Sequence, residues 1–139
     1  MNDLRDLYQE LIIDHSRNPR HFGYLADSTH IHDGYNPLCG DRLTVYCREE
    51  EGVIKEITFE GSGCAISIAS ASLMMEVLKG KTLEQSKILF SQFHALVTGN
   101  SANVERFGKL AALAGVAKFP TRVKCATLCW HTMLAALHD

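Results

Sequence analysis

Three of the five cysteines lie in short segments that could present a thiol for chemistry. The segments read Asn36-Pro37-Leu38-Cys39-Gly40-Asp41, Gly61-Ser62-Gly63-Cys64-Ala65 and Arg122-Val123-Lys124-Cys125-Ala126-Thr127-Leu128. Glycine beside the first two thiols lets the chain turn sharply and lets a bulky atom approach closely. Asp41 adds a carboxylate oxygen. Cys39, Asp41, Cys64 and Cys125 together offer four donors, the number that a tetrahedral metal site requires.

Composition predicts an ordinary compact domain that spans residues 1–139. Apolar residues make up 46% of the chain and charged residues 22%, as in globular proteins. The net charge of −2, without a run of Lys and Arg, argues against nucleic acid as a partner. The charged N-terminus is unlike a signal peptide, and the weakly polar run 65–75 is too short to span a membrane. Cysteines without a secretory signal favour a reducing, cytoplasmic location.

The first half of the chain predicts one helix and one hairpin. Apolar residues recur at helical spacing over residues 3–16, and Asn18-Pro19 should end that helix. Residues 17–40 lack periodicity and are interpreted as loop. Leu43, Val45 and Cys47 then alternate with polar residues, as do Ile57 and Phe59. The intervening Glu50-Glu51-Gly52 makes an antiparallel hairpin the natural connection, with Cys47 in the core.

The second half predicts helices. One covers residues 65–79 and ends at Gly80, and a capping box at Thr82-Leu83-Glu84-Gln85 opens another that reaches about Val97. A third covers 102–114, residues 115–120 break it, and the last carries Trp130, Met133, Leu134 and Leu137 on one face. The fold class is therefore α+β, with a small antiparallel sheet covered by helices and a helical C-terminal half. Cys39, Cys64 and Cys125 all lie at element ends, where a scaffold presents reactive groups.

The three cysteine motifs, in this order, resemble the IscU/SufU/NifU amino-terminal family of iron–sulfur cluster assembly proteins. The resemblance also includes Tyr8, Asp14-His15 and Asn18-Pro19, and so covers nearly the whole chain. It is nearest to the SufU branch, because Lys124 stands where the IscU branch carries a histidine and the stretch between Cys64 and Cys125 is longer than in IscU-like chains. Cys129 departs from the family pattern, which has a small non-cysteine residue before the tryptophan.

The resemblance implies an IscU/SufU-like fold and Zn²⁺ bound by Cys39, Asp41, Cys64 and Cys125. It further implies that Cys39 is the catalytic nucleophile of a zinc-dependent sulfurtransferase. Cys39 would take persulfide sulfur from a SufS-like cysteine desulfurase and pass it toward downstream cluster assembly or acceptor proteins. Arg122 and Lys124 could offset the anionic site or meet acidic surface on a partner.

Several alternatives stay open at this point. The same residues could hold iron or a transient [2Fe–2S] cluster, which would make the chain a scaffold, or the zinc could be purely structural. Cys129 is expected to pack in the core but lies one helical turn after Cys125, within reach of the site. His30 and His32 precede Cys39 and could be spare ligands. His15 and His94 are expected to be partly buried or on the surface.

Overall fold

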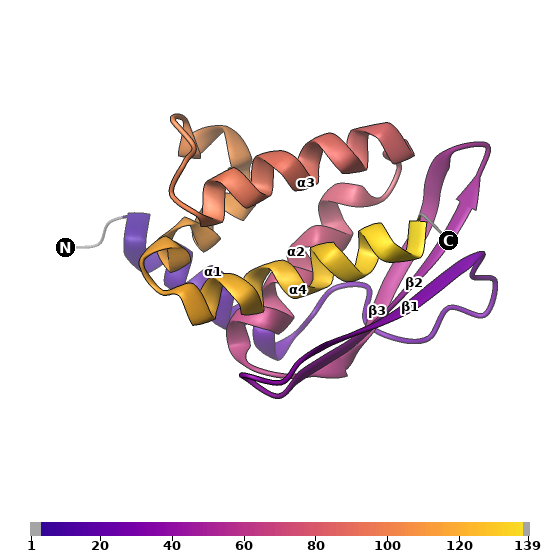
Figure 1. Ribbon diagram of the computed structural model, residues 1–139, viewed down its shortest axis with the longest axis horizontal. Helices are drawn as coiled ribbons and strands as arrows, with labels where there is room; N and C mark the ends of the chain where they lie inside the picture. Colours follow the sequence, from indigo (N-terminus) through magenta and orange to yellow (C-terminus); the bar gives the residue numbers. More distant parts are fainter. Residues whose placement is uncertain (1–3, 138–139) are drawn as a thin grey trace.

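The computed structural model describes residues 4–137 and contains one antiparallel sheet and a set of helices (Figure 1). Asp3, the predicted first residue of the N-terminal helix, lies outside the described residues. The elements in chain order are α1 (Leu4–Arg17), β1 (His30–Asn36), β2 (Asp41–Glu50), β3 (Val53–Ser62), α2 (Ala65–Leu78), α3 (Leu83–Val97), η1 (Val104–Lys118) and α4 (Pro120–Leu137). The predicted α+β class is therefore confirmed.

The sheet has the order β1-β2-β3, with both neighbouring pairs antiparallel. The predicted hairpin corresponds to β2 and β3, whose register pairs Val45 with Phe59 and shifts between Arg48 and Glu49. The alternating apolar side chains of both strands point into the core, where they are fully buried; these are Leu43, Val45, Cys47, Ile57 and Phe59. The core position predicted for Cys47 is confirmed.

The prediction that residues 17–40 form loop was wrong for residues 30–36, which form β1. This edge strand pairs with β2 from His30↔Cys47 to Asn36↔Asp41. It was missed because its inward positions are histidine and glycine, and its outward side chains, including Ile31 and Tyr35, are exposed. The strand therefore lacks the alternation of apolar and polar residues by which strands are recognised.

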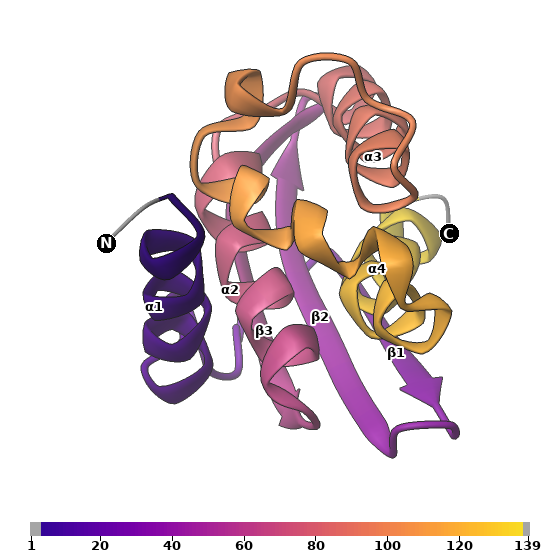
Figure 2. The same ribbon diagram turned by 90° about the vertical axis from the view of Figure 1, so that its left-hand side faces the viewer.

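Helices cover one face of the sheet, with α2 over β3 and α4 over β1 and β2 (Figure 2). Almost all of α2 is buried, because α1, α4 and η1 surround its outer side. The α1 helix is anchored to α2 by His15, whose Nδ1 lies 2.7 Å from Ser72 Oγ. His15 is fully buried rather than partly exposed as predicted, and burial lowers its pKa. Within residues 4–137, none of the helices is long and apolar enough to cross a membrane.

The helix ends agree with the local sequence signals in most places. Thr82 and Gln85 form the predicted capping box of α3, and Gly80, at φ 87°, follows the end of α2. The helix predicted for 102–114 is instead η1, a run of 3₁₀ turns over 104–118 that Gly108 interrupts with φ 57° and ψ −129°. The predicted break at 115–120 shrinks to Phe119, because Pro120 occupies the first position of α4, where proline is well tolerated.

The β1 strand approaches α4 closely at Gly34. A Cβ atom built on Gly34 would overlap with Thr132 Oγ1 and would lie 3.3 Å from a methyl carbon of Leu128. Glycine is therefore required here by the space between strand and helix. This close approach brings the turn after β1 toward the first half of α4, where Cys125 lies.

Substituting Gly34→Ala should lower the free energy of unfolding by about 1–3 kcal/mol, because the added methyl group must push β1 and α4 apart. Denaturant unfolding measures this loss. Adding Thr132→Ala should recover part of it by removing the hydroxyl.

Gly115→Ala is the matched control, since no atom lies within 4 Å of its Cβ position. This variant should be neutral or slightly stabilising. Equal destabilisation at both glycines would contradict the close approach.

Candidate metal centre

The end of the sheet that carries the β1–β2 turn also carries the start of α2. The register pairs Asn36 with Asp41 across the first turn and Arg42 with Ser62 in the next strand, so that the β1–β2 turn and the β3–α2 junction are neighbours. The α4 helix packs across this end and contributes Cys125 from its second turn. Topology thus brings three segments that are distant in sequence to one place.

Cys39 lies at the tip of the β1–β2 hairpin. Asn36 organises this tip: its backbone oxygen accepts a hydrogen bond from Cys39 N at 3.3 Å, and its Oδ1 accepts one from Leu38 N at 3.2 Å. Gly40, at φ 71°, takes the left-handed conformation that closes the turn. The Cys39 side chain is half-buried, and the neighbouring Leu38 is 64% exposed, so the thiol stands at the surface of the molecule.

Asp41 is fully buried and is held through both carboxylate oxygens. Its Oδ1 accepts a hydrogen bond from Cys64 N at 2.9 Å, and its Oδ2 accepts one from Asn36 Nδ2 at 3.4 Å. Gly63 leaves the room for this contact, because a Cβ atom there would overlap with Asp41 Oδ1. Both donors are neutral. A divalent cation would supply the positive charge that a buried carboxylate requires.

Cys125 faces Cys39 and Asp41 from α4 and is only 2% exposed. Its Sγ lies 2.8 Å from the Sγ of Cys39, and Asn36 Nδ2 donates to it at 3.8 Å. Burial, followed by its contacts with Cys39, Asp41 and Cys64, raises the pKa of the Cys125 thiol. A bound cation would reverse this effect by stabilising the thiolate.

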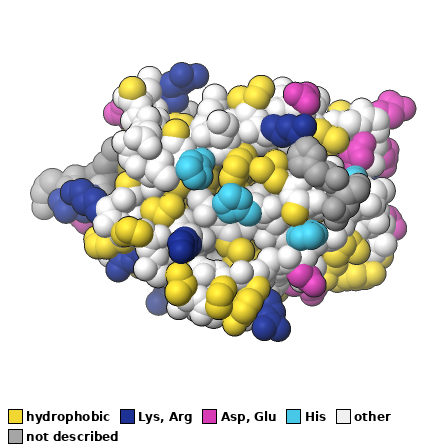
Figure 3. Space-filling view, in the orientation of Figure 1, with side chains coloured by type: hydrophobic (Ala, Val, Ile, Leu, Met, Phe, Trp, Pro, Cys, Tyr) yellow, Lys and Arg dark blue, Asp and Glu magenta, His cyan; other side chains and the backbone are white. Residues whose placement is uncertain are grey.

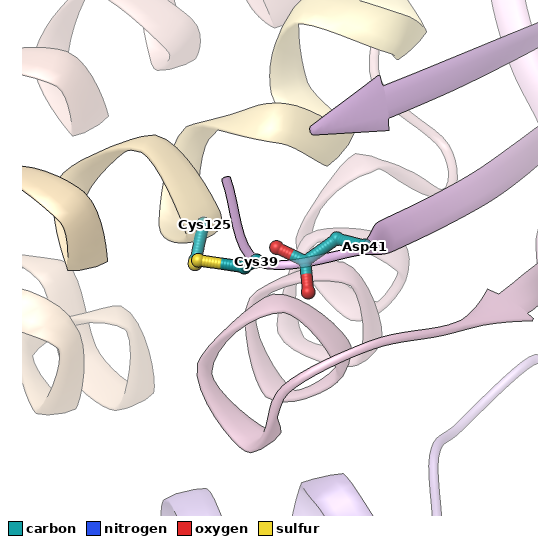
Figure 4. A group of neighbouring side chains, drawn as sticks. All are labelled: Cys39, Asp41 and Cys125. Atoms are coloured by element: carbon teal, nitrogen blue, oxygen red, sulfur yellow. The ribbon is translucent and has the colours of Figure 1, made fainter. Parts of the chain in front are cut away.

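The side chains of Cys39, Asp41 and Cys125 form one compact group of possible metal ligands (Figure 4). One ligand atom from each lies within 4.8 Å of the other two. Among the residues that the structure describes, this is the one group of three or more His, Cys, Asp or Glu side chains that meets this distance. Two thiols and a carboxylate are donors that zinc accepts.

Cys64, the fourth predicted ligand, lies beside this group but outside it. It is the N-cap of α2, and its Sγ accepts a hydrogen bond from Ser67 N at 3.4 Å. It nevertheless lines the same hollow as Cys39 and Cys125, and its thiol interacts electrostatically with Cys125.

The remaining candidate ligands lie elsewhere. Cys129 is fully buried, and its Sγ lies 3.5 Å from Ser70 Oγ; burial raises its pKa to about 12. Its predicted place in the core is confirmed. His30 belongs to β1, and its Nε2 contacts Glu49 Oε1 at 3.1 Å. His32 lies on the same strand, and neither histidine belongs to the ligand group.

An open hollow of about 620 Å³ lies over the thiols. Its wall is the η1–α4 junction, which contributes Lys118, Phe119 and Arg122; the Arg122 guanidinium stacks over the Phe119 ring at 4.4 Å. In Figure 3, apolar and basic side chains gather at the end of the molecule where α4 begins and the hairpin ends. The site therefore offers a partner both apolar and positively charged surface.

Sequence reasoning missed two parts of this site. Asn36 was recognised only as a motif residue, although it contacts both Asp41 and Cys125. Its position five residues before a candidate carboxylate ligand, at the mouth of a tight turn, was the available signal. Phe119 and Lys118 gave no signal, because their role depends on where η1 meets α4.

Comparisons with known proteins agree with this geometry. The family model described as the NifU-like N-terminal domain matches residues 7–126. The zinc-dependent sulfurtransferase SufU of Bacillus subtilis is 40% identical over 94% of this chain and 89% of its own length. The iron-sulfur cluster assembly scaffold protein IscU of Streptococcus pyogenes is 38% identical over 99% of this chain and 86% of its own length.

A solved structure of similar architecture supports the same assignment. It is the crystal structure of a protein from Fervidobacterium islandicum that is named as a scaffold for iron-sulfur cluster assembly in the SUF system. It superposes with a TM-score of 0.85 at 32% identity and covers 97% of this chain and 99% of its own. The chain therefore belongs to the NifU-like N-terminal domain family, the iron–sulfur cluster assembly proteins that include SufU and IscU.

Proposed function

We propose that this protein is a zinc-bound sulfur acceptor that takes persulfide sulfur from a cysteine desulfurase. The observation that carries the proposal is the unequal exposure of the ligand group. Asp41 and Cys125 are buried, whereas Cys39 is half-exposed on a hairpin tip beside an open hollow. Two donors can therefore stay on a metal while the third meets another protein.

The donor set suits zinc. Asp41, Cys64 and Cys125 would hold the ion together with Cys39, which gives three sulfurs and one oxygen in a four-coordinate shell. Zinc has no redox chemistry, so its thiolate ligands stay reduced at the metal while remaining good nucleophiles. Asn36 supports this set by donating to Asp41 and Cys125, as groups behind metal ligands commonly do.

The proposed transfer exchanges one sulfur–sulfur bond for another. The Cys39 thiolate attacks the terminal sulfur of a persulfide on the desulfurase, and the bond between that sulfur and the desulfurase cysteine breaks. The desulfurase cysteine leaves as a thiolate, and Cys39 becomes the persulfide. The exposed side chains of Leu38 and Phe119 and the cations Lys118 and Arg122 would contact the partner during this step.

Assembly of a transient [2Fe–2S] cluster on the same residues is the second candidate. The similarity to IscU proteins of several organisms favours it, because those relatives are named as scaffolds. Against it, the position before Cys125 holds Lys124, an exposed residue of a type that rarely ligates metals. In either case, downstream proteins of cluster assembly would receive the product.

The metal content of the purified chain separates the two candidates. Protein prepared without added metal should contain about one zinc per chain and be colourless. Elemental analysis and a visible absorption spectrum measure this. Chelation should lower the melting temperature, because a ligand that binds only the native state stabilises it.

The contrary result is also specific. Stoichiometric iron with broad visible absorption would favour the scaffold instead. A melting temperature that chelation leaves unchanged would contradict a metal bound at the buried Asp41 and Cys125.

Cys39→Ser should abolish the stimulation of sulfide release by a cysteine desulfurase, because serine cannot accept sulfane sulfur at this position. The desulfurase assay with excess cysteine and a reductant measures the effect. The variant should melt close to the melting temperature of the unmodified chain, since Cys39 lies on a half-exposed turn.

Cys129→Ala removes a thiol that lies outside the ligand group and serves as the matched control. It should retain stimulation once any loss of stability is allowed for. Full stimulation by Cys39→Ser would remove Cys39 from the acceptor role.

Asn36→Ala should weaken zinc binding by about 10–100-fold, because it removes the donor that orients Asp41 and Cys125. Competition with a chromophoric chelator measures the affinity. Asn100→Ala is the control, since Asn100 is exposed and its side chain donates a hydrogen bond to the neighbouring Thr98, away from the ligand group. Unchanged affinity in Asn36→Ala would show that these contacts do not organise the ligands.

A further inference from the structure

The sulfur atoms of Cys39 and Cys125 are closer to each other than zinc ligands would be. They lie 2.8 Å apart, and both residues are free cysteines. Two sulfurs on one tetrahedral zinc ion stand roughly 3.8 Å apart, as bonds of about 2.3 Å at the tetrahedral angle require. A disulfide bond needs about 2.05 Å. The separation of this pair lies between these two values.

Metal binding and disulfide formation therefore exclude each other at this pair. To bind zinc, the sulfurs must separate by about 1 Å. To form a disulfide, they must approach by about 0.8 Å. Cys39 can make either movement, because it lies on a short turn whose Gly40 has no atom within 4 Å of its Cβ position. Cys125 is fixed on α4 and provides the rigid side of the pair.

The other thiols are less suited to this reaction. Cys64 Sγ is engaged by Ser67 N at the start of α2 and lies outside the group that contains Cys39 and Cys125. Cys47 and Cys129 are fully buried in the core, out of reach of a dissolved oxidant. Cys39 touches the Cys125 sulfur, lines the hollow and is the more exposed of the two.

We propose that Cys39 and Cys125 of the metal-free chain form a reversible disulfide couple, with a peroxide as the oxidant. The Cys39 thiolate attacks one oxygen of hydrogen peroxide and the O–O bond breaks, which gives a sulfenic acid and hydroxide. The Cys125 sulfur then attacks the Cys39 sulfur, loses its proton and displaces the sulfenic oxygen as water. In sum, two thiols and one peroxide give one disulfide and two waters.

Formation of this bond would inactivate the whole site at once. It joins residues 86 positions apart and ties the hairpin tip to α4. It removes the exposed nucleophile and two of the metal ligands together. It also protects Cys39 from irreversible oxidation to sulfinic acid, because a disulfide can be reduced by thiols. Formation of the disulfide does not depend on the proposal that Cys39 accepts sulfur. The protection of the two thiols from oxidation by bound zinc, tested below, does rest on the proposed metal site.

Peptide mapping tests the couple. The chain is stripped of metal with a chelator under reductant, transferred to reductant-free buffer, exposed to a small excess of hydrogen peroxide, alkylated, and digested without reduction. The major cross-linked peptide should join Cys39 to Cys125, and dithiothreitol should reverse it. Cys64→Ser should retain this cross-link, whereas Cys39→Ser should abolish it.

Two outcomes would overturn the couple. One is a dominant cross-link that includes Cys64 in the unmodified chain. The other is oxidation of Cys39 to sulfinic acid without any cross-link to Cys125, with circular dichroism showing that the stripped chain is folded.

A parallel reaction tests the competition with zinc. Adding one equivalent of zinc before the peroxide should lower the rate of cross-link formation by roughly tenfold or more, because the bound thiolates are held apart and shielded. Equal rates with and without zinc would overturn the protection and count against the metal site. The cross-link in the metal-free chain would still stand in that case, so the two failures are distinguishable.

Discussion

The antiparallel register of β1 on β2 is the constraint on which the site depends. It ends at Asn36↔Asp41, so that only a four-residue turn separates a buried carboxylate from the strand that precedes it. The next pairing, of β2 with β3, brings the start of α2 to the same edge. A slip by one residue would turn every side chain of β1 to the opposite face. Asn36 would then no longer lie opposite Asp41, and Gly34 would no longer face α4.

The buried charge of Asp41 explains why polar groups and small residues surround it. Asp41 has no contact with water, yet both its oxygens accept hydrogen bonds, one from the Cys64 amide and one from the Asn36 side chain. These dipoles compensate only part of the free energy of burying a carboxylate. The nearby thiols make this location favourable for a cation. The basic residues of the η1–α4 junction make the same location favourable for an anionic surface on a partner.

Much of the fold could be predicted because its signals are local. The capping box at Thr82, the stop at Gly80 and the alternation through Cys47 each need only a few neighbouring residues to be recognised. The strand β1 could not be predicted in this way, because its pairing with β2, rather than its own hydrophobic pattern, makes it a strand. The interruption at Gly108 was likewise not predicted; it lies in η1, which packs against α1, α2, α3 and α4.

The site was predictable in composition but not in arrangement. The residue types in the cysteine motifs identified Cys39, Asp41, Cys64 and Cys125 as candidate donors, and the family resemblance implied the same set. No local pattern carries the contact between Cys39 and Cys125, which joins the tip of a hairpin to a distant helix. The sequence placed Cys64 at the start of a helix, but not the hydrogen bond that its sulfur accepts from Ser67 N outside the group of the other donors.

That cap has a consequence for how the ion could be taken up. Thiol sulfur accepts hydrogen bonds weakly, so a cysteine holds the first turn of α2 far less firmly than the serine or aspartate usually found at such a position. Turning the sulfur away from Ser67 N frees a single amide, which water can satisfy at this half-exposed end. The Cys64 side chain can therefore leave the helix cap with little loss of stability in the rest of the fold.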